Sequence, residues 1–452
     1  MTGSGRTPSV RPFLSSSASF AAGDDTPRAF LERCLEAYSA WEPQISAFVH
    51  TNFAAARAAA DAATARWQGG KPLSGIDGMP VGVKDIIQTE DMPTEMGSPL
   101  FAGWRSGWDA ASVTALREAG AVIVGKTVTT EFAASHPRGT RNPHDVKRTP
   151  GGSSSGSAAA VGAGVISAGL GTQVIGSIVR PAGFCGCVGY KPTVGAINRG
   201  GSLDYLSQSC TGVLAATVQD AWQVAIEIAA RVGGDPGLPG LEGPMQPPAP
   251  VKPRTLALLE TAGWRIASAE AKAALEKAVE RLKAAGVKIV TRGSHPDVEA
   301  AEQAIAEAVS VSVRINDWEW RWPLNSFHER DASKLSRVML DRMARTATMR
   351  PDDYRAALTE RARARAVYAK LAGICDGGLT LTAPGAAPVG LESTGNAVFA
   401  VPGSMLGVPA ISLPLLREQN LPLGLQHTGF AGSDAAAIGI AAWLVQTLGG
   451  EG

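Results

Sequence analysis

Cysteine is scarce in this chain of 452 residues, which has five cysteines and no CxxC pair. We therefore expect neither a disulfide framework nor a cysteine-based zinc site, and we interpret the thiols as small buried groups in a reducing, cytoplasmic setting. Apolar runs of about twenty residues are also absent, so the sequence predicts no helix across a membrane. The formal net charge is only +1, which gives no reason to expect nucleic acid or an anionic membrane as a partner.

The N-terminal region has little that indicates structure. Residues 1–23 are rich in serine, lack acidic side chains and lack the continuous apolar stretch of a signal peptide. We therefore expect a disordered or loosely attached tail over residues 1–25, followed by one domain over residues 26–450. A segment rich in proline and glycine near 233–253 is either a surface excursion of that domain or a domain boundary.

Helical and strand-like segments alternate along the rest of the chain. Thr26 followed by Pro27 predicts the start of a helix. The apolar run at 78–87 predicts a short buried strand that contains Lys84, and residues 256–290 show a strand-helix-strand pattern. This alternation favours an α/β protein in which helices cover a sheet.

A long uncharged segment is the most informative part of the sequence. Residues 151–192 interleave serine and glycine with alanine, valine, isoleucine and leucine, with no charge between Pro150 and Arg180. A flexible linker would not contain apolar residues at this density, so the pattern favours tightly folded, buried backbone. Buried hydroxyl and amide groups need hydrogen-bond partners, and a substrate carbonyl is one candidate.

Lys84 is a candidate base for such a site. Cleaving an amide requires a nucleophile, a base and donors for the developing oxyanion. Histidine often supplies the base, but the chain has six histidines and none lies within 151–192. Burial can lower the pKa of a lysine from about 10.4 toward neutrality, and Lys84 has apolar neighbours along its strand. The alternation of side chains along a strand points the adjacent Asp85 away from it.

Three motifs together resemble those of the amidase signature family: PVGVKDI at 80–86, GGSSSGSAAA at 151–160 and GTQVIGSIVRPAGFCGCVGYKPT at 171–193. The resemblance implies a single α/β/α sandwich domain with a mixed, mainly parallel sheet covered by helices. It also implies hydrolysis of a small-molecule amide without a metal or organic cofactor. A homodimer is compatible with the resemblance, although no segment of the sequence indicates an interface.

The resemblance also implies roles for individual residues. Neutral Lys84 would draw a proton through Ser153, which follows a cis peptide bond, while Ser177 attacks the substrate carbonyl. The resulting acyl-enzyme would then be hydrolysed by water. Backbone N–H groups would form the oxyanion hole. These are the N–H groups of Val174, Ile175, Gly176 and Ser177.

Several positions depart from the most familiar form of the motif. Gln173 replaces an aspartate and Val179 replaces an arginine, so a charged pair is lost together and we expect no orphaned buried charge. Ile175 replaces a glycine and places a β-branched side chain beside the expected oxyanion hole. Arg180 follows one position later, and its place is left open by the sequence. We expect Gln173 and Ser154 to support the site, and we interpret the chain as a GTQ variant within the family.

An aromatic group offers candidates for the substrate pocket. Trp318 and Trp322 lie with Trp320 and Phe327 in one segment, and Tyr205 follows the core motif. We expect Tyr205, Trp318 and Trp322 to line the pocket, and packing in the core is the alternative for the tryptophans.

Three functions remain open from the sequence. The first is a free-standing amidase that releases ammonia or an amine from a linear amide. The second is a glutamine-hydrolysing amidotransferase subunit that requires a partner protein. The third is an inactive scaffold on the same fold, which the presence of Lys84, Ser153 and Ser177 disfavours.

Overall fold

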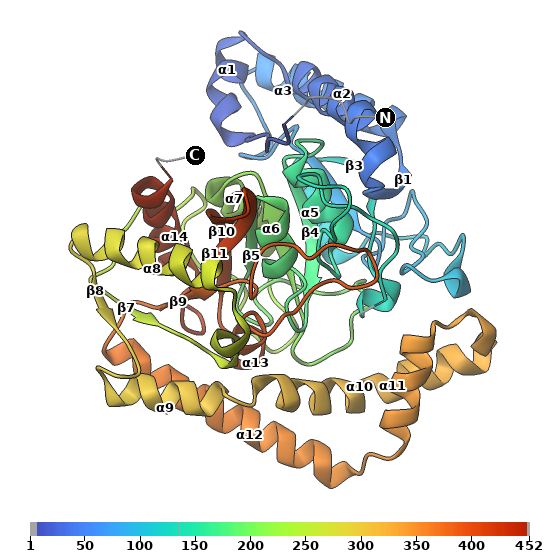
Figure 1. Cartoon of the computed structure of the whole chain (residues 1–452). Coiled ribbons are helices and arrows are strands. Elements are labelled where there is room, and N and C mark those ends of the chain that lie inside the picture. Colours follow the sequence, from blue (N-terminus) through green and yellow to red (C-terminus); the bar gives the residue numbers. More distant parts are fainter. Residues whose placement is uncertain (1–6, 135, 450–452) are drawn as a thin grey trace.

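The computed structural model describes residues 7–134 and 136–449. Its centre is one eleven-stranded sheet with the order β1-β3-β2-β4-β6-β5-β10-β11-β9-β7-β8. Helices lie on both sides of this sheet (Figure 1). The strands are β1 Phe48–Thr51, β2 Pro80–Lys84, β3 Val122–Thr127, β4 Ala168–Gln173, β5 Val188–Lys191, β6 Cys210–Ala215, β7 Thr255–Leu258, β8 Lys288–Val290, β9 Gly378–Leu381, β10 Ala410–Glu418 and β11 Leu421–Thr428.

The sheet is mixed, as expected, but it is not mainly parallel. Parallel pairing joins β2 to β3 and β4, and β7 to β8 and β9. The central strands β4, β6, β5, β10 and β11 pair antiparallel. The connections give the physical reason, because consecutive strands can pair parallel only when a long crossover connection, usually a helix, joins them. The tight turn at Gln419 and Asn420, both with positive φ, instead makes β10 and β11 an antiparallel hairpin.

Two groups of helices cover opposite faces of the sheet. Apolar residues of α4, α7, α8 and α14 form one core, and those of α2, α3, α5 and α6 form the other. In β3, Ile123 belongs to the first core whereas Val122 and Val124 belong to the second, as the alternation of a strand requires. The expected sandwich of helices around a sheet is therefore confirmed. The helices are α1 Ser17–Ala22, α2 Pro27–Ile45, α3 Phe53–Gln68, α4 Ala111–Glu118, α5 Ser155–Gly162, α6 Val179–Cys185, α7 Val218–Val232, α8 Ala269–Ala284, α9 Pro296–Ile305, α10 Ala308–Asp331, α11 Arg337–Ala347, α12 Pro351–Ala369, α13 Val401–Leu406 and α14 Asp434–Leu448.

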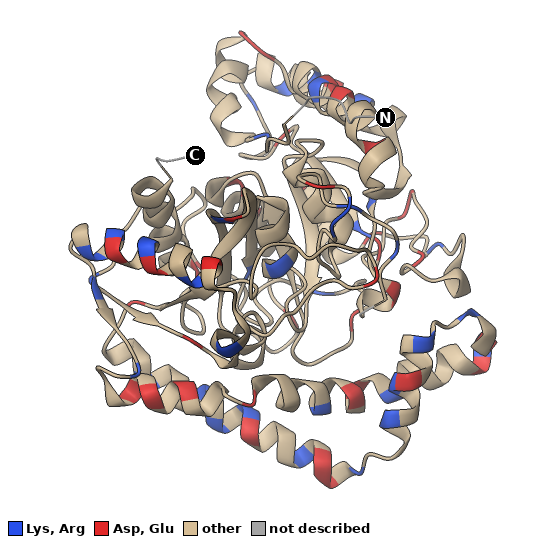
Figure 2. Cartoon of the chain, viewed as in Figure 1, with Lys and Arg blue, Asp and Glu red and all other residues tan. Residues whose placement is uncertain are grey.

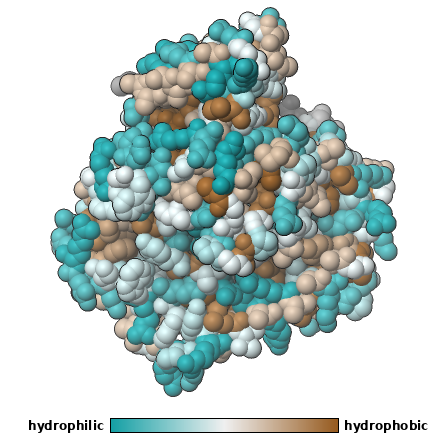
Figure 3. All heavy atoms as spheres, turned by 180° about the vertical axis from the view of Figure 1, so that it is seen from behind, coloured by the Kyte–Doolittle hydropathy of each residue, from teal (hydrophilic) through white to brown (hydrophobic). Residues whose placement is uncertain are grey.

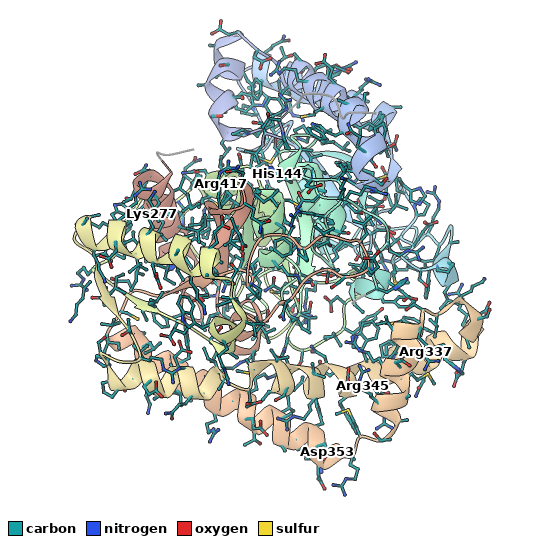
Figure 4. The ribbon with its side chains drawn as sticks, in the orientation of Figure 1. His144, Lys277, Arg337, Arg345, Asp353 and Arg417 are labelled. Carbon is teal, nitrogen blue, oxygen red and sulfur yellow. The ribbon has the colours of Figure 1, made fainter. Side chains whose placement is uncertain are left out.

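A further layer is formed by the long helices α9 to α12, which extend along one side of the molecule (Figure 1). Acidic and basic residues are interspersed along α12 (Figure 2), as on a solvated helix, whereas the charged residues of α9 are all acidic. Arg345 of α11, labelled in Figure 4, pairs with Asp317 of α10 at 3.2 Å. On the face seen in Figure 3, small apolar groups are interspersed among hydrophilic residues. The layer matters for function because α10 forms one wall of the cavity described below.

The N-terminal segment corrects the expectation of a disordered tail for residues 7–25. Phe13 and Phe20 are buried, and their rings pack against each other and against Phe30 of α2. The backbone N–H of Leu14 donates to Asp220 of α7 at 3.0 Å. Two phenylalanines seven positions apart supply enough apolar area to dock the segment, although its composition is otherwise polar. Residues 1–6 lie outside the described residues.

Several local predictions are confirmed. The Thr26 side chain accepts the N–H of Ala29, and Pro27 is the first residue of α2. The 233–253 segment contains no regular helix or strand, and β7 after it joins the same sheet, which favours a surface excursion over a domain boundary. In the part of the chain that the structure describes, no helix combines the length and apolarity needed to span a membrane.

Candidate active site

Lys84 is the last residue of β2, at the edge where β2 and its parallel neighbour β4 both end. Its side chain is fully buried. The Nζ atom donates to Ser153 Oγ at 2.7 Å, to Thr172 Oγ1 at 2.8 Å and to the Thr172 carbonyl at 3.3 Å. Burial, which penalises the charged form, lowers the pKa of Lys84 to about 7. A large share of Lys84 is therefore neutral near pH 7 and able to accept a proton.

Asp85 points to the other side of the strand, as its position predicts. Its carboxylate lies 3.0 Å from Lys126 Nζ and accepts the N–H of Glu95 at 3.1 Å. The burial of Asp85 is thus compensated by Lys126, and its charge is not available to Lys84. Within residues 7–134 and 136–449, no carboxylate lies within ion-pair distance of Lys84, which leaves desolvation as the dominant influence on its pKa.

Ser153 and Ser154 lie at the turn that leads into α5. The peptide bond between Gly152 and Ser153 is cis, as the resemblance implies. The Ser154 N–H donates to the Ser177 carbonyl at 3.3 Å, and its Oγ donates to the Thr172 carbonyl at 3.4 Å. Ser154 therefore connects the Ser153 turn to the Ser177 loop.

Ser177 lies at the end of the loop that joins β4 to α6, and it lines a cavity of about 670 Å³. In the described part of the chain, the backbone N–H groups of residues 174–177 donate no hydrogen bond to another protein group. They remain available for an oxyanion beside the Ser177 hydroxyl. Gly176 cannot be larger, because a Cβ there would lie 2.9 Å from the Ala400 side chain.

Gln173 holds this loop in place. Its Oε1 accepts the N–H groups of Ile178 at 2.7 Å and of Val179 at 3.0 Å, at the start of α6. Its Nε2 donates to Ser404 Oγ at 3.0 Å, and that hydroxyl donates to the Ile175 carbonyl at 2.9 Å. A neutral amide thus satisfies the backbone of the loop where the familiar motif has an aspartate. The Ile175 side chain packs against the apolar cluster that includes α12 and α13.

The expectation that no buried charge lacks a counter-ion is wrong for Arg180. The side chain is buried, and Nη2 donates to the Gly152 carbonyl at 2.6 Å and to Thr394 Oγ1 at 2.9 Å. No carboxylate of the described residues lies within ion-pair distance of its guanidinium. Arg180 is therefore a buried cation whose hydrogen bonds go to neutral groups.

The structure places Tyr205 in the lining of the cavity, whereas it places Trp318 and Trp322 outside that lining. Tyr205 lines the cavity, as do Trp320 and Phe327 of α10. Trp318 instead stacks on Tyr354 of α12, and Trp322 is 67% exposed, with its ring edge-on to that of Tyr205. The helical repeat explains the difference, because positions 320 and 327 share one face of α10 whereas 318 and 322 face elsewhere.

His144 is the histidine closest in sequence to the serine-rich segment, and it lies at the other end of α6 from Ser177. Its Nε2 lies 3.1 Å from the carbonyl oxygen of Cys185, the last residue of α6, whereas Ser177 precedes the first turn of that helix. Burial lowers the pKa of His144, and Figure 4 shows its location relative to the helical layer of α9 to α12. The geometry leaves Lys84 as the base candidate beside the serines.

Thr172 is a residue that sequence reasoning missed. It lies in β4, whose register places Leu170 beside Val83 of β2, so residues just beyond that pair meet Lys84. Its position directly before Gln173 in the motif could have indicated that Thr172 lies near the site. The residues alone do not reveal that β2 pairs with β4, and this pairing brings Thr172 to Lys84.

Asn316 of α10 was also missed by the sequence analysis. It lines the cavity, and both polar atoms of its buried amide lack a hydrogen-bond partner in the described structure.

Known proteins similar to this chain point to one family. The family model Amidase matches residues 29–438. A glutamyl-tRNA(Gln) amidotransferase subunit of Chloroflexus aurantiacus is 45% identical over 226 residues, which span 48% of this chain and only 46% of that protein. The corresponding subunit from Solidesulfovibrio magneticus is 33% identical over 455 residues, covering 92% of each chain. A crystal structure of an amidase matches with a TM-score of 0.83 and 28% identity, over 97% of this chain and 100% of that one. The chain belongs to the amidase family of enzymes that act on carbon–nitrogen bonds.

Proposed function

We propose that the chain is a free-standing amidohydrolase that cleaves a linear C–N amide bond of a small molecule and releases ammonia or an amine. Lys84, Ser153 and Ser177 would form its catalytic triad. The observation that carries the proposal is the 2.7 Å hydrogen bond between the fully buried Lys84 and Ser153. A lysine buried without a carboxylate beside it is costly to keep charged, and its use as a base accounts for that cost.

The proposed first half-reaction moves one proton along the triad. The Ser177 hydroxyl gives its proton to Ser153, whose own proton passes to neutral Lys84, while Ser177 Oγ forms a bond to the substrate carbonyl carbon. The carbonyl oxygen becomes an oxyanion that accepts hydrogen bonds from the free N–H groups of residues 174–177. One such donor is typically worth about 3 kcal/mol of barrier.

Collapse of the tetrahedral intermediate completes this half-reaction and uses the same relay in reverse. The Lys84 ammonium returns its proton through Ser153 to the leaving nitrogen as the C–N bond breaks, and an acyl-enzyme on Ser177 remains. Water then adds to the ester carbonyl, the relay accepts the proton of the water, and Ser177 leaves with its hydroxyl restored. No cofactor enters this sequence.

Fluorophosphonate labelling followed by intact mass and peptide mapping tests the proposal without knowledge of the substrate. We expect one adduct on Ser177 and none in Ser177→Ala. Ser155→Ala is the matched control, because Ser155 lies in the same motif but its hydroxyl donates to the Val128 carbonyl at 3.2 Å and not to a member of the proposed triad. Labelling of another serine, or equal labelling of Ser177→Ala, would exclude Ser177 as the nucleophile.

A second candidate function is a glutamine-hydrolysing amidotransferase subunit. The observation that favours it is the match to curated proteins named as subunits of an amidotransferase, one of them over 92% of this chain. The two candidates differ in what the isolated chain does. Ammonia release from simple amides by the purified chain alone supports the free-standing enzyme, whereas release from glutamine that requires added partner proteins supports the second candidate. Light scattering of the same sample tests the expected homodimer.

A further inference from the structure

Asn316 of α10 is a buried amide without a hydrogen-bond partner. Only 1% of the residue is exposed, and neither Oδ1 nor Nδ2 has a partner among the described residues. The side chain nevertheless lines the cavity that contains Ser177. A buried amide that has lost its contacts with water destabilises the folded chain unless other groups complete its hydrogen bonds. A molecule bound in the cavity can supply those groups.

The helical repeat aligns Asn316 with the aromatic part of the cavity. Asn316, Trp320, Pro323 and Phe327 all line the cavity, and their spacing of four, three and four residues places them on one face of α10. The Phe132 ring lies 6.4 Å from that of Trp320 and stacks at 4.5 Å on that of Phe327. These rings form an apolar wall against which a flat ring of a substrate can pack.

Asn316 lies where this wall meets the surroundings of the nucleophile loop. Helix α10 packs against α13. Ile315 belongs to the apolar cluster that also includes α13 and Ile175, whereas Trp320 belongs to the core that includes Phe132. Asn316 is positioned between the two. A substrate whose carbonyl lies in the nucleophile loop can therefore reach Asn316 and the aromatic wall together.

The neighbours of Asn316 do not explain the amide by a structural role. Arg342 also lines the cavity, but it pairs with Asp317 at 3.0 Å and lies over the Trp320 ring. Ser312, one turn earlier on α10, is buried, and its hydroxyl likewise has no partner in the described structure. A leucine at position 316 would fill a similar volume without a polar group to satisfy. Packing alone therefore does not require an asparagine here.

The chemistry of the amide indicates which group it can bind. The side chain of Asn316 presents a donor and an acceptor next to each other. A primary carboxamide presents the same two groups, so its N–H can donate to Oδ1 while its oxygen accepts from Nδ2. A carboxylate has only acceptors and would leave Oδ1 facing another oxygen. An alkyl group would leave both atoms without a partner.

We propose that Asn316 binds a second carboxamide in the acyl part of the substrate, so that the preferred substrates are aromatic dicarboxamides. One amide is cleaved at Ser177, the ring packs against the wall of Trp320, Phe132 and Phe327, and the other amide pairs with Asn316. Asn316 thus determines specificity by holding the ring so that the scissile carbonyl lies over the nucleophile. This inference rests on the proposed amidohydrolase function and names its substrate class.

The test compares the ortho, meta and para benzenedicarboxamides with the isopropylbenzamides of the same substitution, in which an isopropyl group of similar size replaces the second carboxamide. Calorimetry measures binding to Ser177→Ala, which requires no turnover. We expect at least one dicarboxamide to bind on the order of 10-fold more tightly than its isopropyl counterpart, as for two neutral hydrogen bonds. Adding Asn316→Leu should remove this preference. Ser312→Ala is the matched control, because it removes another unpartnered polar group of α10 that is not part of the cavity lining, and it should keep the preference.

The outcomes separate this inference from the function on which it rests. Equal binding within all three pairs, or a preference that persists in Asn316→Leu, overturns the carboxamide site. Labelling of Ser177 by fluorophosphonate reports independently whether the nucleophile is active. Thermal unfolding checks that Asn316→Leu is folded. If it is not, Asn316→Asp decides the question, because it keeps the size of the side chain but lacks the N–H donors and should also lose the preference.

Discussion

The pH dependence of kcat/KM offers a direct test of Lys84 as the base, because its pKa sets how much of the enzyme is active. An ordinary lysine has a pKa of 10.5, and burial lowers that of Lys84 to about 7. This difference corresponds to about 5 kcal/mol at 1.36 kcal/mol for each pH unit. At pH 7 about half of Lys84 is neutral, compared with roughly one in three thousand for an ordinary lysine. Burial therefore provides about a thousandfold more of the base.

The sign of the effect follows from the form that catalyses. The neutral amine accepts the proton, so activity should be nearly constant well above pH 7 and should fall about tenfold for each unit below it. Thr172→Val should move this fall to lower pH. The variant removes the Thr172 Oγ1 acceptor, which lies 2.8 Å from Lys84 Nζ and stabilises the ammonium, so the pKa of Lys84 should decrease further.

The assay is kcat/KM between pH 5 and 9 with an amide whose chemical step limits the rate, as shown by the absence of an acyl-enzyme burst. Lys84→Met should lower kcat by at least about 10²–10⁴ and should abolish the inflection in its residual activity. A flat profile for the unmodified enzyme, or an inflection near 7 that persists in Lys84→Met, would refute the assignment of Lys84 as the base.

The remaining predictions concern packing and the pocket. Gln173→Leu should destabilise the fold by about 3 kcal/mol, measured by denaturant unfolding, because two backbone N–H groups and Ser404 lose their partner. Trp320→Ala should raise KM for amide substrates, whereas Trp322→Ala, which removes an exposed ring outside the cavity lining, should leave it nearly unchanged. Phe20→Ala should cost about 3–5 kcal/mol, measured by thermal or denaturant unfolding. A negligible loss would mean that the N-terminal segment contributes little to the fold.

The parts of the site that could be predicted from the sequence are those determined locally. An apolar strand with one lysine predicts that the lysine is buried, and alternation predicts that Asp85 lies on the other side. Both predictions are confirmed by the structure. The start of α2 at Pro27 is similarly local, because the Thr26 side chain reaches an N–H only three residues away.

The parts that could not be predicted depend on which elements meet in space. Nothing in the order of the tryptophans indicates which face of α10 meets the cavity, so Trp318 and Trp322 were as plausible as Trp320. The docking of Phe13 and Phe20 likewise depends on a gap beside Phe30 that only the folded chain provides. The antiparallel centre of the sheet follows from the route of the connections and not from the composition of the strands.

Lys84 and Arg180 are both buried basic residues of the site, but burial leaves them in different charge states at neutral pH. Burial lowers the pKa of Lys84 to about 7 and that of Arg180 to about 10. At pH 7 Lys84 is therefore divided between its two forms, whereas Arg180 favours its charged form by roughly a thousandfold. One site thus contains both a proton acceptor and a permanent cation. Arginine at position 84 would remain charged, so Lys84→Arg should be as inactive as Lys84→Met although it keeps the charge that a purely electrostatic role would need.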